Sequence, residues 1–213
     1  MTFRLERGAG GYLLADSSGT HGALSIDFES LHPRVQRGGR ELVARAVQAR
    51  PGLKVVDATA GLGTDSFILA SRGCEVTMIE RSHTLYLMLE EALARGERSA
   101  SVAGMVARMR LLRGDATWQL ARLDEPPDVV LIDPMFPSRS KSARVKGSLT
   151  TLQSLVGKDQ SVLALLSRAR AVARQRVVLK RPLRGGEVAG HQPSGSIRGK
   201  ASRFDIYAPT GAG

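Results

Sequence analysis

The sequence predicts an α/β domain with a mostly parallel central sheet, helices on both faces and a small β element ahead of it. Apolar runs typical of strands alternate with helical patterns from residue 53 onward, which is the pattern of βαβ units. A loop of small residues, 57–65, joins the first of these strands to a helix. The 213 residues are enough for one substantial core. We expect the β element at residues 1–30 and the main domain at 31–213.

The chain before residue 53 carries strand and helix patterns of its own. Alternating apolar and polar residues with glycines between them predict a hairpin over residues 3–14. A further strand is expected at Ala23–Phe28. The basic, glycine-bearing segment 32–41 leads into a helix whose apolar residues lie within 42–47, and Pro51-Gly52 ends that helix.

From residue 53 the predicted elements alternate. Strands are expected at residues 54–58, 75–80, 110–114, 128–133, 176–180 and 203–208. Helices are expected at 65–71, between an N-cap at Ser82 and a stop at Gly96, and around 162–169. In such a sheet a ligand binds at the carboxyl ends of the parallel strands.

The charge of the chain is strongly unbalanced. It has 31 Lys and Arg residues against 20 Asp and Glu, a formal net charge of +11. That excess predicts attraction to a polyanion such as nucleic acid. The alternative is a soluble protein that is merely basic.

Several classes of site are disfavoured by composition. Cys74 is the single cysteine, so an intrachain disulfide and an all-cysteine metal site are excluded, which suits a reducing cytoplasm. The four histidines show no metal-ligand spacing, and we expect no metal. The first residues lack the apolar core of a signal peptide, and no apolar run approaches the roughly 18 residues that span a bilayer. We therefore expect a cytoplasmic protein with no membrane partner.

The loop after the first strand carries the first candidate ligand contacts. Asp57 ends the strand, and Gly61 and Gly63 allow a ligand to approach the backbone closely. The dinucleotide pattern G-x-G-x-x-G would need glycine at Ser66, and the pattern D-x-G-x-G-x-G would need it at Thr59. The loop alone therefore does not choose between cofactors.

Two further acids follow the next strands. Glu80 ends the second strand, 23 positions after Asp57, which suits a carboxylate that accepts hydrogen bonds from ribose hydroxyls. Asp115 follows the third strand, where a carboxylate can accept a bond from an adenine amino group. Each acid alone is also compatible with an ordinary strand end or turn.

The most specific pattern is DVVLIDPMFP. Asp133 follows a buried strand, and Pro134 and Pro137 force the chain out of the sheet as an extended loop. An acid, a proline and an aromatic two residues further on are typical of enzymes that methylate amino groups. The Asp133 carboxylate can accept N–H bonds from an exocyclic amine, and the Phe136 ring can stack on a base for roughly 1–3 kcal/mol. The alternative is an Asp-Pro turn with Phe136 in the core.

With these motifs the sequence resembles the class I methyltransferases that use S-adenosylmethionine (SAM). More narrowly, it is similar to the bacterial 16S ribosomal RNA (guanine-N2) methyltransferase family of the RsmJ type. The matching stretches cover about residues 25–208. They are VVDATAGLGTD, IER at 79–81, LIDPMFP, K-SA--K at 141–146, LQSLVG at 152–157, VVLKRP and RFDIYA.

The resemblance implies a Rossmann-like fold, SAM as cofactor and methyl transfer to guanine N2 of the small-subunit RNA. It implies cofactor contacts from Thr64, Asp65, Glu80, Arg81, Asp115, Ala116 and Asp133. Asp133 would orient the amine and Phe136 would stack on the base. Together with Asp57, Gly61 and Gly63 from the loop, these residues form the predicted site.

The excess positive charge is concentrated after the DPMFP turn. Residues 138–148 contain no acid, and residues 174–203 contain mainly basic charges with Glu187. Such residues neutralise phosphates and give salt-dependent affinity for RNA. We expect RNA contacts from Arg139, Lys141, Arg144, Lys146, Lys180 and Arg181. The alternative is a solvated loop.

Three rival functions remain on the sequence alone. A methyltransferase for DNA adenine or a protein amide would more usually show Asn-Pro-Pro-aromatic than Asp133-Pro134-Met135-Phe136. A nicotinamide-dependent oxidoreductase is disfavoured by Ser66 and by the lack of a proton donor near the motifs. A non-catalytic RNA-binding protein is disfavoured because the acids at the strand ends are all present.

Overall fold

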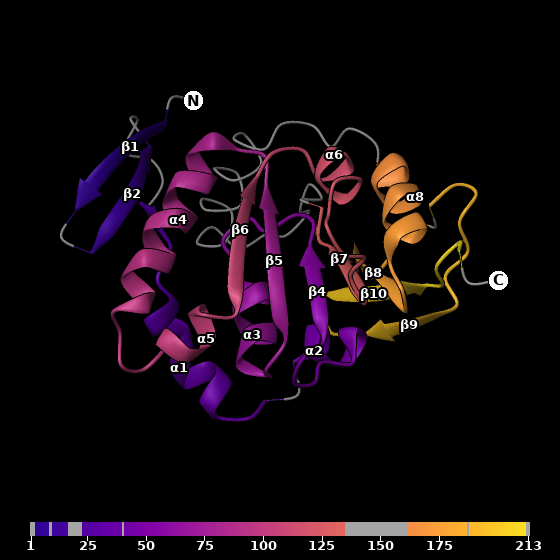
Figure 1. Cartoon of the computed structure of the whole chain (residues 1–213), viewed down its shortest axis with the longest axis horizontal. Coiled ribbons are helices and arrows are strands. Elements are labelled where there is room, and N and C mark those ends of the chain that lie inside the picture. The colour runs from indigo at the N-terminus through magenta and orange to yellow at the C-terminus, as the bar shows by residue number, and fades with distance from the viewer. Residues whose placement is uncertain are drawn as a thin grey trace.

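The main sheet organises the molecule. The structure is a computed structural model that describes residues 3–8, 10–16, 23–39, 41–134, 162–186 and 188–211. Its strand order is β6-β5-β4-β7-β8-β10-β9 (Figure 1). The strands are β4 (Lys54–Asp57), β5 (Glu75–Glu80), β6 (Met109–Arg113), β7 (Val129–Ile132), β8 (Arg176–Pro182), β9 (Gly195–Arg198) and β10 (Ser202–Tyr207).

The centre of this sheet is parallel. Strand β4 pairs with β5 on one side and β7 on the other, and β6 and β8 extend the parallel set. Strand β10 pairs antiparallel with both β8 and β9. The chain adds β5 and β6 on one side of β4 and then β7 and β8 on the other. At such a reversal of strand order, a ligand commonly binds in the crevice between the carboxyl ends of β4 and β7. The predicted mostly parallel sheet is confirmed.

Helices cover both faces because successive residues of a buried strand point to opposite sides. In β7, Val129 and Leu131 pack into one hydrophobic cluster, whereas Val130 and Ile132 pack into the other. The helices on the first side are α1 (Phe28–Gln36), α2 (Leu42–Val47), α3 (Thr64–Ser71), α4 (His83–Glu97) and α5 (Ala103–Val106). Those on the second side are α6 (Ala116–Leu120) and α8 (Val162–Val172).

A separate antiparallel sheet of β1 (Phe3–Gly8), β2 (Gly11–Asp16) and β3 (Leu24–Ser25) precedes the main sheet. The predicted hairpin is confirmed. Strand β2 lies against α4 at one end of the molecule (Figure 1). Leu14, Leu24 and Ile26 are buried in the same cluster as the helices of the first side. The small sheet therefore shares a core with the main domain.

The predicted strands of the main sheet are confirmed to within two residues, but other expectations were wrong. The strand expected at Ala23–Phe28 stops at Ser25, because Phe28 begins α1 and its ring stacks on Phe67 at 5.3 Å between centroids. Gly96 does not end α4. It lies against Val106, where a Cβ would come within 2.8 Å of a methyl carbon.

In the antiparallel part of the sheet, strand β10 carries a buried ion pair. Arg203 on β10 donates from Nε to Asp205 Oδ1 at 2.9 Å. Its Nη1 donates to the carbonyl oxygens of Pro182, Leu183 and Gly185 at 3.2, 3.0 and 2.7 Å. Strand β10 thereby fixes the turn that follows β8.

No helix in the described part of the chain combines the length and apolar character needed to cross a membrane.

Candidate active site

Three predicted acids meet at one edge of the sheet. Asp57 ends β4, Glu80 ends β5 and Asp133 follows β7. The register sets Asp57 opposite Met78 and Leu131. Because neighbouring parallel strands end at the same edge, carboxylates far apart in the sequence come together there.

The first acid lies beneath the loop that it begins. Asp57 is 2% exposed, and its Oδ2 accepts the Ser66 hydroxyl at 2.6 Å while Oδ1 accepts the Thr59 backbone N–H at 3.2 Å. Burial raises the pKa of Asp57 to about 7, although both donors oppose the shift. The structure therefore places this predicted cofactor contact under the loop, where it supports the backbone.

The two glycines of the loop are required by its shape. Gly63 caps α3 with φ of +70°, and a Cβ there would lie 3.0 Å from Leu89 and 3.2 Å from the Phe28 ring. Gly61 has φ of +57°, and its N–H donates to Glu80 Oε2 at 2.9 Å. The loop is thus tied to the end of the neighbouring strand.

Glu80 is 4% exposed and is held by backbone donors. Besides Gly61, the N–H of Ser82 donates to its Oε1 at 2.7 Å. Burial raises its pKa above the ordinary value, and these two N–H groups limit the shift. Asp115 caps α6, accepting the Thr117 N–H at 2.8 Å, and it is exposed.

Asp133 is anchored through its backbone and its side chain. Its N–H donates to the Thr59 hydroxyl oxygen at 2.6 Å, which links the β7 exit to the first loop. Its Oδ2 accepts from Lys180 Nζ at 2.6 Å. The same ammonium donates to Asp65 Oδ2 at 3.1 Å and lies 5.7 Å from the centre of the Phe204 ring.

The charges of this cluster shift one another. Burial raises the pKa of Asp133 to about 6; the Lys180 ammonium opposes that rise and the Asp65 carboxylate adds to it. Burial would lower the pKa of Lys180, but attraction to Asp133 and Asp65 raises it above its ordinary value. Lys180 therefore stays protonated, and Asp133 is ionised at neutral pH.

A pocket brings many of the predicted residues together at this edge. Six of them line it, namely Gly61, Glu80, Arg81, Asp115, Ala116 and Asp133. The other lining residues are Ala58, Thr59, Ile79, Gly114, Thr117, Pro134 and Leu165. Four predicted residues, Asp57, Gly63, Thr64 and Asp65, lie in or under the adjoining loop and helix start. Small and apolar side chains beside a buried acid suit a nucleoside.

Several predicted residues fall outside the described part of the chain. They are Phe136, Arg139, Lys141, Arg144 and Lys146, and their roles stay predictions. Arg181 lies on β8, and its guanidinium donates to the Gly186 carbonyl. Lys180, expected to contact RNA, has its ammonium in contact with the carboxylates of Asp65 and Asp133, and its RNA contact stays a prediction.

The structure also adds residues that the motifs did not reveal. Thr59 and Ser66 stand where two glycine patterns fail, and the structure shows that their hydroxyl groups bond Asp133 and Asp57. The sequence signal that could have revealed these two residues is a polar side chain close to an acid in the chain. The contact of Lys180 with Asp133 spans 47 positions, and no local pattern indicates it.

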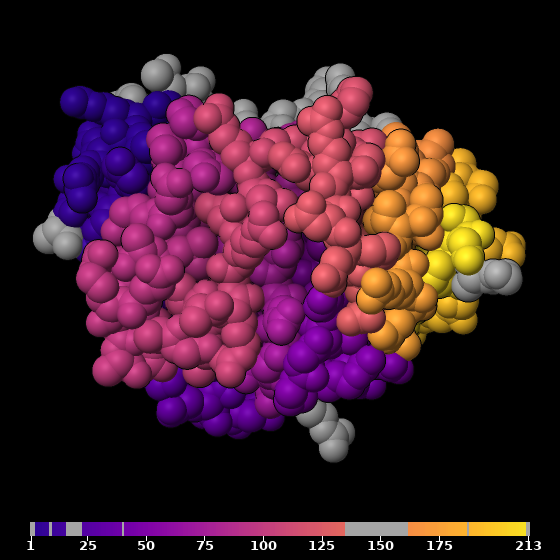
Figure 2. Space-filling model, viewed as in Figure 1, coloured from indigo at the N-terminus to yellow at the C-terminus, as the bar shows by residue number. Residues whose placement is uncertain are grey.

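A larger groove of about 620 Å³ lies elsewhere, over the face of β4, β5 and β6. The five residues of α6 leave this face uncovered, so the purple atoms of β4 and β5 are visible in Figure 2 between those of β6 and α8. None of the predicted site residues in the described ranges lines it. We therefore take the smaller pocket at the acids as the candidate site. Within the described ranges, no group of three His, Cys, Asp or Glu side chains is arranged to hold a metal.

Comparison with known proteins shows the family of the chain. Residues 9–209 match the sequence model of a family described as "Putative SAM-dependent methyltransferase". Two similar proteins are named ribosomal RNA small subunit methyltransferase J. That of Pseudomonas aeruginosa (strain LESB58) is 46% identical over 91% of this chain and 76% of its own. That of Pseudomonas syringae pv. tomato is 44% identical over 87% of this chain and 72% of its own.

A solved structure has the same fold. The SAM-dependent methyltransferase NGO1261 from Neisseria gonorrhoeae superposes with a TM-score of 0.77 at 37% identity, covering 95% of this chain and 81% of its own. The family match and the identity both extend over most of the chain. The chain therefore belongs to the family of SAM-dependent methyltransferases that includes ribosomal RNA small subunit methyltransferase J, and its cofactor is SAM.

Proposed function

We propose that this enzyme methylates the exocyclic N2 amine of a guanine in 16S ribosomal RNA of the small subunit, in the cytoplasm. The observation that carries the proposal is the Asp133 carboxylate, which lines the same pocket as Glu80 and Asp115. An acceptor for an amine thus lies beside a seat for a nucleoside cofactor. The names of the Pseudomonas relatives support RNA of the small subunit as the substrate.

The pocket suits SAM in its hydrogen-bond acceptors and its apolar side chains. Glu80 would accept the ribose hydroxyls, and Asp115 would accept the adenine amino group. Ala58, Ile79 and Leu165 offer apolar surface to the adenine ring. We assign the remaining contacts to Gly61, Gly63, Thr64, Asp65, Arg81 and Ala116 along the loop and the strand ends. Asp57 acts from beneath by holding the loop.

In the proposed mechanism the protein mainly positions the reactants. SAM supplies a methyl group on a sulfonium that is already a good leaving group. Asp133 accepts an N–H bond from the amine and aims the nitrogen at the methyl carbon. The methyl group would come from the sulfonium of bound SAM, and the Asp133 carboxylate or water would accept the proton that the nitrogen loses. Phe136 stacks on the base, and a base within a helix would have to be unstacked or flipped out.

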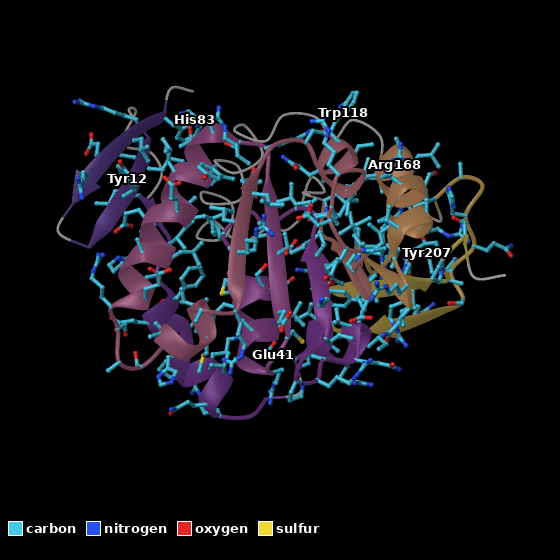
Figure 3. The ribbon with its side chains drawn as sticks, viewed as in Figure 1. Tyr12, Glu41, His83, Trp118, Arg168 and Tyr207 are labelled. Carbon is cyan, nitrogen blue, oxygen red and sulfur yellow. The ribbon has the colours of Figure 1, made fainter. Side chains whose placement is uncertain are left out.

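The surface beside the pocket suits RNA. Trp118 on α6 is 67% exposed at the edge of the molecule (Figure 3), and the Arg122 guanidinium lies 5.8 Å from its ring centre. Its neighbour Thr117 lines the pocket. Such aromatic and basic groups suit a nucleic acid. The net charge of +11 adds general attraction to phosphates, as do the basic residues predicted after Phe136.

The test is methyl transfer from radiolabelled SAM to small subunits that lack the modification, followed by mass mapping of the modified nucleoside. We expect N2-methylguanosine from the wild-type enzyme. Asp133→Ala should lower the rate by at least about 1,000-fold, because the amine loses its acceptor. Asp124→Ala, at an exposed acid of the larger groove, is the matched control and should keep the rate. Label in adenine, in protein or in no acceptor at all would overturn the proposal.

A further inference from the structure

Lys180 contacts Asp133, the acid of the proposed catalysis, and Asp65, in the first turn of the helix that follows the glycine loop. Its Nζ lies 2.6 Å from Asp133 Oδ2 and 3.1 Å from Asp65 Oδ2. The parallel register sets Leu179 opposite Ile132, so the next residue on each strand brings Lys180 and Asp133 together at the sheet edge. Asp65 reaches the same ammonium from the first turn of α3.

The surroundings shield this contact from water. The side chain of Lys180 is 28% exposed, and those of Asp65 and Asp133 are 19% and 35% exposed. The Phe204 ring of β10 lies beside the ammonium, with its centre 5.7 Å away. Charges in such a partly closed site interact more strongly than an exposed pair.

The other charges near Asp133 are mostly negative. The carboxylates of Asp57 and Asp65 interact with one another and with Asp133. Arg34 lies near Asp65, but its guanidinium is bonded to both carboxylate oxygens of Glu41. Without Lys180, the partly exposed Asp133 carboxylate would lie near the acids Asp57 and Asp65 with its main positive neighbour removed.

A hydrogen-bond acceptor has to be unprotonated, and this requirement gives the lysine a role. A protonated Asp133 would present a hydroxyl to the amine at one of its two oxygens. The bond from Lys180 to Oδ2 stabilises the charged form and leaves Oδ1 able to accept from another donor.

We propose that Lys180 is a positioning residue that keeps the Asp133 carboxylate ionised and turns Oδ1 toward the substrate amine. Its ammonium is used inside the site and does not bind an RNA phosphate. The statement about the amine rests on the proposed function. The statement about the charge of Asp133 does not, so the two can fail separately.

The direct test follows the Asp133 carboxyl carbon by ¹³C NMR as a function of pH in the substrate-free enzyme. In the wild type the carboxyl should titrate near the pKa of about 6. Lys180→Met should raise this midpoint by at least about two pH units, because the cation that favours the charged form is gone. Lys180→Arg should restore it to within about half a unit. Lys54→Met removes a lysine at the first residue of β4, at the other end of the strand from the acids. It should leave the Asp133 midpoint unchanged.

Asp65→Asn gives a second test if Lys180→Met does not fold. Removing the Asp65 charge removes a repulsion, so the Asp133 midpoint should move to lower pH. An unchanged midpoint in Lys180→Met, or in Asp65→Asn where that variant has to serve, would overturn the proposed charge control whatever the substrate proves to be.

The kinetic test separates positioning from RNA or cofactor binding. Lys180→Met should lower kcat at neutral pH by at least about 10-fold and recover about 10-fold for each pH unit until the raised midpoint is passed. Its KM for small subunits and its Kd for SAM should stay within about 3-fold of the wild type. A raised KM with unchanged kcat would show an RNA contact, and a raised Kd with unchanged kcat a cofactor contact; either would overturn the proposal.

Discussion

The two halves of the sheet edge hold their acids in different ways. In the β4–β5 half, Asp57 and Glu80 are bonded to uncharged donors, namely backbone N–H groups and the Ser66 hydroxyl. In the β7–β8 half, Asp133 is bonded to the Lys180 ammonium. Burial raises the pKa of all three acids.

The two kinds of hydrogen-bond donor have different effects on a carboxylate, one on its position and the other also on its charge. Uncharged donors fix where a carboxylate lies and bind the loop to it, so the β4–β5 half builds a rigid seat for a cofactor. A cation also determines the protonation state, which suits the proposed role of Asp133 as an acceptor for a substrate amine. Four substitutions test this division, from the largest expected effect to the smallest.

Glu80→Ala should cause the largest loss in the β4–β5 half. The Gly61 and Ser82 N–H groups lose their acceptor, and SAM would lose its ribose partner. We expect a fall in SAM affinity on the order of 1,000-fold, measured by calorimetry. Glu80→Gln should also be costly, since an amide has one oxygen for two donors. Glu90→Ala, an exposed acid on α4, is the control; wild-type affinity in Glu80→Ala would show that this half is not the seat.

Asp57→Asn should change how stability depends on pH. The folded chain keeps a proton on Asp57 up to about pH 7, whereas the unfolded chain loses it near its ordinary pKa of 3.8. The free energy of unfolding of the wild type therefore falls as pH rises through this window, by roughly 2–4 kcal/mol from this group.

Asparagine suits the site, because its oxygen can accept from Thr59 and its amide can donate to the Ser66 hydroxyl. Urea unfolding of Asp57→Asn from pH 4 to 8 should lack that fall. A variant with the wild-type slope would show that Asp57 is not the group that titrates.

Ser66→Ala should have a smaller effect in the same place. The hydroxyl donates to Asp57 Oδ2 at 2.6 Å and favours its charged form. Its loss should cost about 1–2 kcal/mol at pH 8, where Asp57 is ionised, and less at pH 5. Urea unfolding at both pH values measures this, with Ser71→Ala on the same helix for comparison. Equal costs at the two pH values would contradict the role of the hydroxyl as a donor to a charge.

Lys54→Met should have the smallest effect. Lys54 and Glu125 form an exposed ion pair at the opposite edge of the sheet, with side chains 45% and 62% exposed. Water screens such a pair, so we expect no measurable change in melting temperature or in methyl transfer. A loss comparable with that of Lys180→Met would mean that burial does not distinguish the two lysines.

The frame of the site could be predicted from the sequence because its signals are local. Apolar runs predicted the strands, and acids at the ends of neighbouring parallel strands have to lie at one edge of the sheet. Helix α1 was not predicted, because Pro33 and several polar residues interrupt the apolar periodicity of a helix. Helix α6 escaped because Asp115 has the sequence context of a turn residue and only five residues follow in the helix.

The charge partner of Asp133 could not be predicted in the same way. Lys180 belongs to a basic stretch, and basic stretches are typical of RNA contacts. Its position beside Asp133 depends on the pairing of β7 with β8, and its contact with Asp65 depends on the start of α3. Such contacts depend on tertiary structure, and no spacing along the chain encodes them.

The place of β10 has a consequence for synthesis on the ribosome. This strand is inserted between β8 and β9, and its Phe204 ring lies beside the Lys180 ammonium. While residues up to 182 are emerging, β8 has β7 as a neighbour but its other edge is still open. The surroundings of Lys180 are complete only after residue 207 has left the exit tunnel. The nascent chain can therefore form the loop after β4 before the Lys180 ammonium is fully enclosed.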